Sequence, residues 1–155
     1  FDLTEGMLRA GRERFAGRDD LQWVCGNAEA LPFEDNSFDA YTISFGLRNV
    51  SRPELALAEA RRVLRPGGRF FCLEFSRVVL PILKDIYDQY SFKLLPTLGG
   101  MVAGDRESYQ YLVESIRRFP PQERLEDMMR EAGFGRVQHR NMSGGIVAVH
   151  HGWRI

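Results

Sequence analysis

The sequence has no excess of charge of either sign, because 21 lysines and arginines are balanced by 21 aspartates and glutamates. This balance excludes proteins that attract nucleic acid or an anionic surface through their overall field, so any such contact would be local. The 155 residues, 44% of them hydrophobic, suit one globular domain with a single core. We therefore expect one domain, residues 1–155, that binds no nucleic acid.

Cysteine is scarce, and the two cysteines do not form a metal-binding pattern. Cys25 and Cys72 lie in apolar stretches, without the CxxC or Cys/His spacing of a metal site. This setting favours reduced thiols in the core over a disulfide or metal ligands. We expect no bound metal.

Long apolar runs, an initiator methionine and a GxGxxG loop are also lacking. No run approaches the ~20 residues of a transmembrane helix, which predicts a soluble or peripheral protein. Without GxGxxG, a dinucleotide-dependent oxidoreductase has no support. The first residues, FDLTEGML, are typical of the middle of a domain, so we expect that an upstream segment is missing.

Strand and helix patterns alternate in the first half of the chain. Two apolar runs bounded by turn residues, LQWVC (21–25) and FDAYTISF (38–45), predict buried strands. The S-x-x-E run that begins at Ser51 contains an early proline and predicts the start of a helix, which a Pro-Gly-Gly run ends. RFFCLEF (69–75) is typical of a parallel strand that is covered on both faces. This order predicts a right-handed βαβ unit.

The second half begins with an insertion, residues 80–119, whose aromatic-rich segments have helical patterns. An amphipathic helix follows and ends at Gly133, with its apolar positions at Leu125, Met128, Met129 and Ala132. Two final runs, residues 134–141 and 145–155, predict a pair of strands. We expect these strands to be antiparallel because a short Ser-Gly-Gly turn joins them.

Polar residues stand where the predicted strands end, which is where ligands bind in doubly wound sheets. Asp2 offers two carboxylate oxygens that suit the two hydroxyls of a ribose, although it also suits a helix N-cap. The side chain of Asn27 and the backbone N–H of Ala28 suit the edge of an adenine, although Asn27 also suits an Asx turn. The residues alone leave these alternatives open.

Arg48 and Asn49 form a second polar group, directly after the predicted strand 38–45. A guanidinium at the mouth of a buried strand needs an anionic or strongly accepting partner. That partner is a ligand or, alternatively, a carboxylate such as Glu74 at the end of the neighbouring strand. Asn49 in turn either faces the ligand or caps the next helix.

Two neighbouring histidines, His150 and His151, occur in the last predicted strand. Successive strand residues point to opposite faces, so at most one of these imidazoles faces the core or a pocket. A lone strand histidine is more often structural than catalytic, and we favour that interpretation here.

The chain resembles the UbiE/COQ5 C-methyltransferases of ubiquinone and menaquinone biosynthesis in four runs: GNAEALPFEDNSFDAYTISFGLRNV, RRVLRPGGRFFCLEFS, GDRESYQYLVESIRRFPPQERLEDMMREAGF and GGIVAVHHGW. The resemblance implies an α/β class I methyltransferase (Rossmann-like) fold, with a seven-stranded sheet whose last strand is antiparallel, and S-adenosyl-L-methionine as cofactor. The family's first strand and glycine-rich loop have no counterpart here. The resemblance therefore implies an N-terminally truncated chain, unstable by itself and unable to bind the cofactor tightly.

Individual cofactor contacts also follow from the resemblance. It implies that Asp2 binds the ribose and that Asn27 and Ala28 bind the adenine. It further implies that Ser44 lies near the methionine end of the cofactor.

Arg48 and Asn49 correspond in this resemblance to a pair near the quinol ring, and they are the predicted catalytic residues. The insertion 80–119 corresponds to a substrate lid, with tyrosines at Tyr87, Tyr90, Tyr109 and Tyr111. Apolar residues of the same insertion, Phe92, Leu94, Leu95, Pro96, Leu98 and Met101, form either a membrane-facing mouth or an ordinary helix core.

The implied reaction is methylation of a ring carbon in a polyprenyl benzoquinol of the 2-polyprenyl-6-methoxy-1,4-benzoquinol type, or in a demethylmenaquinol. Two alternatives remain: another small-molecule methyltransferase of the same fold, and a truncated, non-catalytic scaffold. The implied partners are a lipid-tailed quinol, a second copy in a homodimer, a quinone-biosynthesis complex and the membrane surface. The implied location is the bacterial cytoplasm at the inner face of the membrane or, alternatively, the matrix face of the mitochondrial inner membrane.

Overall fold

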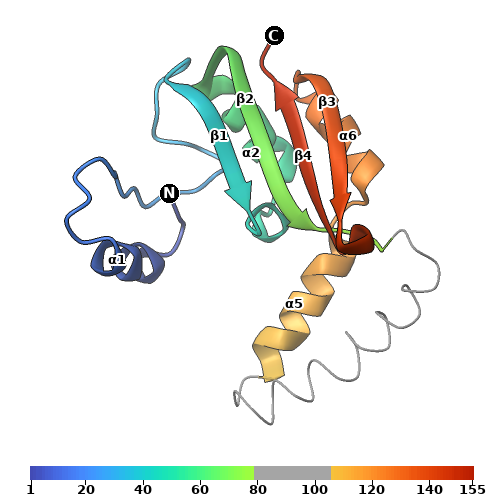
Figure 1. The fold of residues 1–155 in the computed structure, drawn as a ribbon, viewed down its shortest axis with the longest axis horizontal. Coiled ribbons are helices and arrows are strands. Elements are labelled where there is room, and N and C mark those ends of the chain that lie inside the picture. The colour runs from blue at the N-terminus through green and yellow to red at the C-terminus, as the bar shows by residue number, and fades with distance from the viewer. Residues whose placement is uncertain (79–105) are drawn as a thin grey trace.

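The computed structural model of this protein describes residues 1–78 and 106–155. At its centre a sheet has the strand order β1–β2–β4–β3 (Figure 1). The strands are β1 (Phe38–Ser44), β2 (Leu64–Phe75), β3 (Gly135–Met142) and β4 (Val147–Trp153). β1 pairs with β2 in parallel, whereas β4 is antiparallel to both β2 and β3. The predicted parallel pair with its connecting helix and the antiparallel last strand are therefore confirmed.

The helices that surround this sheet within the described residues are α1 (Glu5–Arg14), α2 (Pro53–Val63), α5 (Arg106–Arg118) and α6 (Gln122–Glu131). Short 3-10 turns, η1 (Leu47–Asn49) and η3 (Ser143–Gly145), follow β1 and β3. α2 and α6 lie on one face of the sheet, and α5 extends beyond the end of the sheet at which β1 and β2 finish (Figure 1). None of the described helices is both long and apolar enough to cross a bilayer.

Every second side chain of β2 belongs to the core. Phe70, Cys72 and Glu74 are buried, while Phe71 and Phe75 on the opposite face are half-buried. The buried apolar cluster joins η1, α2, β2, α6 and β3, with side chains Leu47, Ala56, Leu57, Ala60, Leu64, Phe70, Cys72, Phe119, Leu125, Met129, Phe134 and Val137. Burial of a large apolar side chain stabilises a fold by about 1.5–3 kcal/mol. Within the described residues, helices cover the one face of the sheet on which α2 and α6 lie, so the predicted cover on both faces of β2 is not found in this part of the chain.

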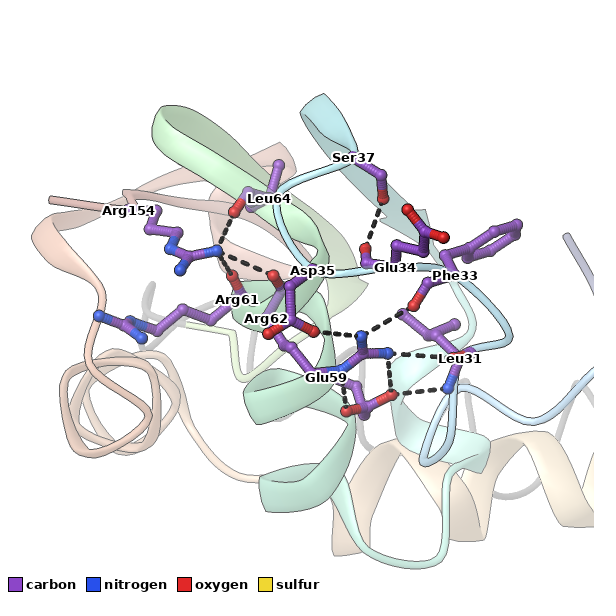
Figure 2. Close-up of polar contacts among 10 residues, drawn as sticks. All are labelled: Leu31, Phe33, Glu34, Asp35, Ser37, Glu59, Arg61, Arg62, Leu64 and Arg154. Atoms are coloured by element: carbon purple, nitrogen blue, oxygen red, sulfur yellow. Dashed lines mark hydrogen bonds and ion pairs between the residues drawn. The ribbon is translucent and has the colours of Figure 1, made fainter.

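α2 begins with a proline, whose fixed φ suits the first helical turn, but the predicted capping box is not formed. Arg52 occupies the N-cap position, and no side chain caps the helix there. At the other end, Arg154 Nη1 donates hydrogen bonds to the carbonyls of Arg61 and Arg62, at 3.1 and 2.8 Å, and to that of Leu64 (Figure 2). Carbonyls at the end of a helix lack intrahelical donors, so this arginine near the end of the chain completes α2.

The prediction that LQWVC forms a strand is wrong. Only Cys25 forms a β-bridge, with Asp2, through hydrogen bonds from Asp2 N to Val24 O at 3.2 Å and from Gly26 N to Asp2 O at 3.0 Å. A strand needs a continuous row of such bonds, and within the described ranges this segment has no further bridge. Cys25 is accordingly exposed, so the predicted burial is confirmed for Cys72 alone.

Candidate functional site

The candidate site lies at the carboxyl end of β1, where the chain turns sharply before η1. Phe45 has a φ of 54°, a left-handed conformation that non-glycine residues rarely adopt. Its N–H donates to Leu73 O of β2 at 2.8 Å, and its carbonyl accepts hydrogen bonds from Arg48 Nη1 at 2.6 Å and Asn49 Nδ2 at 3.5 Å. The turn thus brings both predicted catalytic side chains to one carbonyl oxygen. Ser44, the last residue of β1, is exposed.

Arg48 forms a buried ion pair with Glu74 of the neighbouring strand β2. Its Nη1 lies 2.7 Å from Glu74 Oε1 and 3.2 Å from Oε2, and only 11% and 1% of the two side chains are exposed. Glu74 Oε2 also accepts a hydrogen bond from Phe75 N at 2.9 Å. The ring centres of Phe45 and Phe75 lie 6.0 and 5.3 Å from the guanidinium carbon. The sequence left open whether Arg48 pairs with a ligand or with Glu74, and in the structure it pairs with Glu74.

The ion pair does not satisfy the whole guanidinium. Arg48 Nε is buried and has no hydrogen-bond partner among the described residues. A buried donor without a partner costs about 1–3 kcal/mol, so such groups in native proteins call for an explanation. Burial raises the pKa of Glu74, and the adjacent Arg48 charge opposes that rise. The arrangement can offer a charged N–H to an oxygen atom of a ligand.

Asn49 connects this turn to α5. Tyr111 Oη donates a hydrogen bond to Asn49 Oδ1 at 3.1 Å, and α5 contacts η1, so the helix lies beyond the carboxyl end of β1 (Figure 1). Asn49 does not cap α2, because it is the last residue of η1 and no side chain caps that helix. Tyr109 belongs to α5 as well, whereas Tyr87, Tyr90 and the predicted apolar mouth lie outside the described residues.

Asp2 and Asn27 are brought close together by the β-bridge described above. Asp2 Oδ1 accepts a hydrogen bond from Thr4 N at 2.7 Å, and Thr4 rather than Asp2 occupies the N-cap position of α1. Asn27 Oδ1 accepts one from Glu29 N at 2.9 Å, which is the Asx turn that the sequence left open. Ala28 is half-buried and packs against the apolar core. Asp2 Oδ2 and Asn27 Nδ2 have no hydrogen-bond partner within the described ranges.

Two arginines attach the loop after Asn27 to α2: Arg52 at the N-cap of that helix and Arg62 within it. Arg52 N donates to Glu29 Oε1 at 2.9 Å, and its guanidinium pairs with the same carboxylate at 2.8 Å. Arg62 makes hydrogen bonds of 2.7 to 3.0 Å to Glu59, Asp35 and the carbonyls of Leu31 and Phe33 (Figure 2). The bonds from Arg62 lower the pKa of Glu59.

Sequence reasoning missed this attachment. Glu59 and Arg62 are three residues apart on one helix, a spacing that is typical of an ordinary surface ion pair. No local pattern indicates that the guanidinium reaches a loop far upstream. The acids of the loop, Glu29 for Arg52 and Asp35 for Arg62, are the available signals.

His150 is the histidine that faces the core. It is 1% exposed, while His151 on the opposite face is half-buried. His150 Nε2 lies 3.1 Å from the carbonyl oxygen of Gln122 and therefore carries the proton, whereas Nδ1 is buried without a partner in the described part of the chain. Burial lowers the pKa of His150. These contacts, between α6 and β4, are those of a neutral structural residue.

The sequence comparisons identify close relatives. Residues 1–154 match the family model described as the ubiE/COQ5 methyltransferase family. A curated relative from Paracoccus denitrificans, the ubiquinone/menaquinone biosynthesis C-methyltransferase UbiE, is 62% identical over 99% of this chain and 63% of its own length. The protein of the same name from Methylobacterium nodulans is 63% identical over 99% of this chain and 62% of its own length. The chain thus spans about three-fifths of the length of these relatives.

Solved structures show the same architecture at much lower identity. A SAM-dependent methyltransferase from Thermotoga maritima has a TM-score of 0.70 and 23% identity, and the match covers 99% of this chain and 70% of that protein. Another from Aquifex aeolicus has a TM-score of 0.67 and 15% identity, and the match covers 99% and 66%. These likenesses concern the fold alone, and they confirm the predicted class I methyltransferase fold.

Proposed function

Because this chain belongs to the ubiE/COQ5 methyltransferase family, we propose that the complete protein methylates a ring carbon of a polyprenyl benzoquinol or a demethylmenaquinol, with S-adenosyl-L-methionine as the methyl donor. The observation that carries this proposal is the guanidinium of Arg48 at the end of β1, buried with an unpaired Nε. An arginine in this setting suits an oxygen atom that becomes negative during a reaction.

The residues around the β-bridge suit the adenosine part of the cofactor. Asp2 has a carboxylate oxygen that no described residue binds, and this oxygen can accept a hydrogen bond from a ribose hydroxyl. The amide nitrogen of Asn27 has no partner among residues 1–78 and 106–155 and, with the backbone N–H of Ala28, suits an adenine edge. Ser44 supplies an exposed hydroxyl at the end of β1 for the methionine part. When bound, the cofactor supplies an electrophilic methyl group.

Deprotonation of the quinol is the step that this chain's own residues assist. A ring carbon of a hydroquinone is a weak nucleophile until a neighbouring hydroxyl loses its proton, after which negative charge spreads to the ortho and para carbons. Arg48 donates its free Nε–H to that oxygen and stabilises the developing charge. A guanidinium stays charged at neutral pH, so Arg48 does not accept the proton, which passes to water. Asn49, held by Tyr111 and by the Phe45 carbonyl, orients the ring or that water.

Arg48→Ala in the complete protein tests the assignment. Turnover is expected to fall about 10²-fold or more, because a charge-directed contact to the reacting oxygen is lost. The dissociation constant of S-adenosyl-L-methionine, measured by calorimetry, is expected to change less than about twofold. Arg124→Ala, which removes an exposed ion pair with Glu131 on α6, is the control and should preserve both values. Unchanged turnover with weakened cofactor binding in Arg48→Ala would show that Arg48 is not catalytic.

A further inference from the structure

We propose that Glu74 is a positioning residue for Arg48, which fixes the guanidinium so that the unpaired Nε–H is presented to the substrate oxygen. This inference rests on the proposed function, because it names the residue that orients Arg48 for that reaction. Glu74 itself touches no substrate in this account, and it acts only through the arginine.

Among the described residues, the hydrogen bonds of the Arg48 guanidinium come from one of its three nitrogens, Nη1. Nη1 donates to both carboxylate oxygens of Glu74, at 2.7 and 3.2 Å, and to the carbonyl of Phe45 at 2.6 Å. The ring centres of Phe45 and Phe75 lie about as close to the guanidinium carbon as cation–π contacts require. Together these contacts hold the planar group from one edge, and among the described residues Nε is left buried and unpaired.

Glu74 has the rigidity that a positioning residue needs. It lies in β2, between β1 and β4, where it is opposite Ala148 in the antiparallel register. Its side chain is 1% exposed, and its Oε2 is fixed by the N–H of Phe75 at 2.9 Å. The direction of the arginine is therefore set by the centre of the sheet rather than by the turn alone.

Arg62 is an arginine of the same molecule whose contacts are structural, and Arg48 differs from it. Arg62, whose contacts attach a loop to α2, donates hydrogen bonds from Nε, Nη1 and Nη2 (Figure 2). Arg48 is more deeply buried than Arg62, with 11% against 30% of the side chain exposed, yet its Nε has no partner in the part of the chain that the structure describes. A buried structural arginine should satisfy its donors, so the orphan Nε points to a ligand that completes the set.

The test is a double-mutant cycle in the complete protein, with methyl transfer to a quinol as the activity. Glu74→Gln preserves the shape of the side chain and is expected to lower kcat at least about tenfold, with the dissociation constant of S-adenosyl-L-methionine changed less than about twofold. In an Arg48→Ala background the same substitution is expected to cause no further loss, because Glu74 acts through the removed group. The proposal would be overturned if the fold losses in kcat of the two single variants multiply in the double variant. A wild-type kcat in Glu74→Gln would overturn it as well.

A matched control comes from another largely buried carboxylate. Glu126 of α6 is paired with Arg130 and with His139, and 15% of its side chain is exposed. Glu126→Gln weakens these pairs, which do not involve Arg48, and is expected to leave kcat per folded molecule unchanged. If Glu74→Gln does not fold, Glu74→Asp replaces it in the cycle, since that variant keeps the charge and only shortens its reach.

A second measurement does not depend on the quinol. In the ¹⁵N-labelled complete protein, the Nε–H signal of Arg48, assigned by its loss in Arg48→Lys, is expected to exchange with water at least about tenfold faster in Glu74→Gln than in the wild type or in Glu126→Gln. Equal exchange rates would contradict the positioning role. If the wild type methylates no quinol, the proposed function fails, and this measurement still decides whether Glu74 fixes Arg48.

Discussion

At the scale of single residues, Phe45 has the most unusual backbone of the candidate site. An aromatic residue with a φ of 54° is strained, and conformations of this kind cost on the order of 1–3 kcal/mol. Its carbonyl accepts hydrogen bonds from both Arg48 and Asn49. Strain at this position therefore coincides with the point where the two predicted catalytic side chains meet.

His150 predicts how the stability of the protein depends on pH. Burial lowers its pKa below the ordinary value of about 6.5, so the unfolded chain binds a proton more readily than the folded protein does. Stability that is present at neutral pH is consequently lost as the pH falls below about 6.5 towards the pKa of the folded state. We expect the urea midpoint of His150→Gln, which cannot titrate, to fall less than that of the wild type between about pH 7 and about pH 5.5.

The control for this prediction is His151→Gln, on the opposite face of β4. It is expected to keep the pH dependence of the wild type. An equally steep loss of stability in His150→Gln would show that other groups cause the acid sensitivity.

A side chain of the candidate site could be predicted where its neighbours in the sequence indicate its role. Arg48 and Asn49 were recognisable because a charge and an amide directly follow an apolar strand. The partner of Arg48 was not, because a ligand and a buried carboxylate impose the same requirement on an arginine. For Asn27, the observed Asx turn occupies Oδ1 but leaves Nδ2 available, so the two alternatives for this residue are compatible.

At the scale of elements, the strands at β1 and β2 were predictable because β1 is rich in β-branched and aromatic residues and the second half of β2 is a nearly continuous apolar run, and the two strands pair with each other. LQWVC has a similar composition but makes a single bridge. Strand formation depends on a partner edge as well as on local propensity, and composition does not reveal whether that edge is present. The attachment of the loop to α2 through Arg62 was equally hidden, since it joins residues distant in sequence.

α5 is expected to influence the quinol more than the cofactor, because its Tyr111 bonds to Asn49. Tyr111→Phe removes only the hydroxyl, and we expect kcat/KM for the quinol to fall by about threefold to tenfold, the equivalent of one hydrogen bond. The affinity for S-adenosyl-L-methionine should not change. Gln110→Ala, which removes a bond to Glu114 on the same helix, is the control with wild-type kinetics. Wild-type kinetics in Tyr111→Phe would remove α5 from the site.

The attachment of the loop to α2 predicts a difference between two arginines. Arg62→Met keeps the apolar stem but loses bonds to two carboxylates and two loop carbonyls, so we expect a loss of about 1–2 kcal/mol in the free energy of unfolding of the complete protein. Arg130→Met removes pairs with Glu126 and Asp127 on its own helix and one long hydrogen bond, of 3.4 Å, to the Val137 carbonyl, and it should cost less than about 0.5 kcal/mol. Urea unfolding measures both, and equal losses would mean that the loop contacts add nothing.

At the scale of the whole molecule, the apolar core and the first residues of the chain differ in the contacts that hold them. The sheet with α2 and α6 forms the apolar core, whereas the first residues are connected through one β-bridge and the loop that follows it. The chain spans about three-fifths of the length of its curated relatives, so activity is a property to be measured on the complete protein. The overall class of fold was predictable because the order of strands and helices and the family resemblance agree, and the solved structures have the same fold.

We propose that the complete protein transfers a methyl group to carbon, assisted by Arg48. The most direct measurement supplies S-adenosyl-L-methionine labelled in its methyl group, together with a polyprenyl benzoquinol that lacks the ring methyl, and locates the label in the product by NMR. We expect label on a ring carbon with the wild type and about 10²-fold less product with Arg48→Ala. Label on a quinol oxygen, or no labelled quinol from a folded complete protein that binds the cofactor, would contradict it.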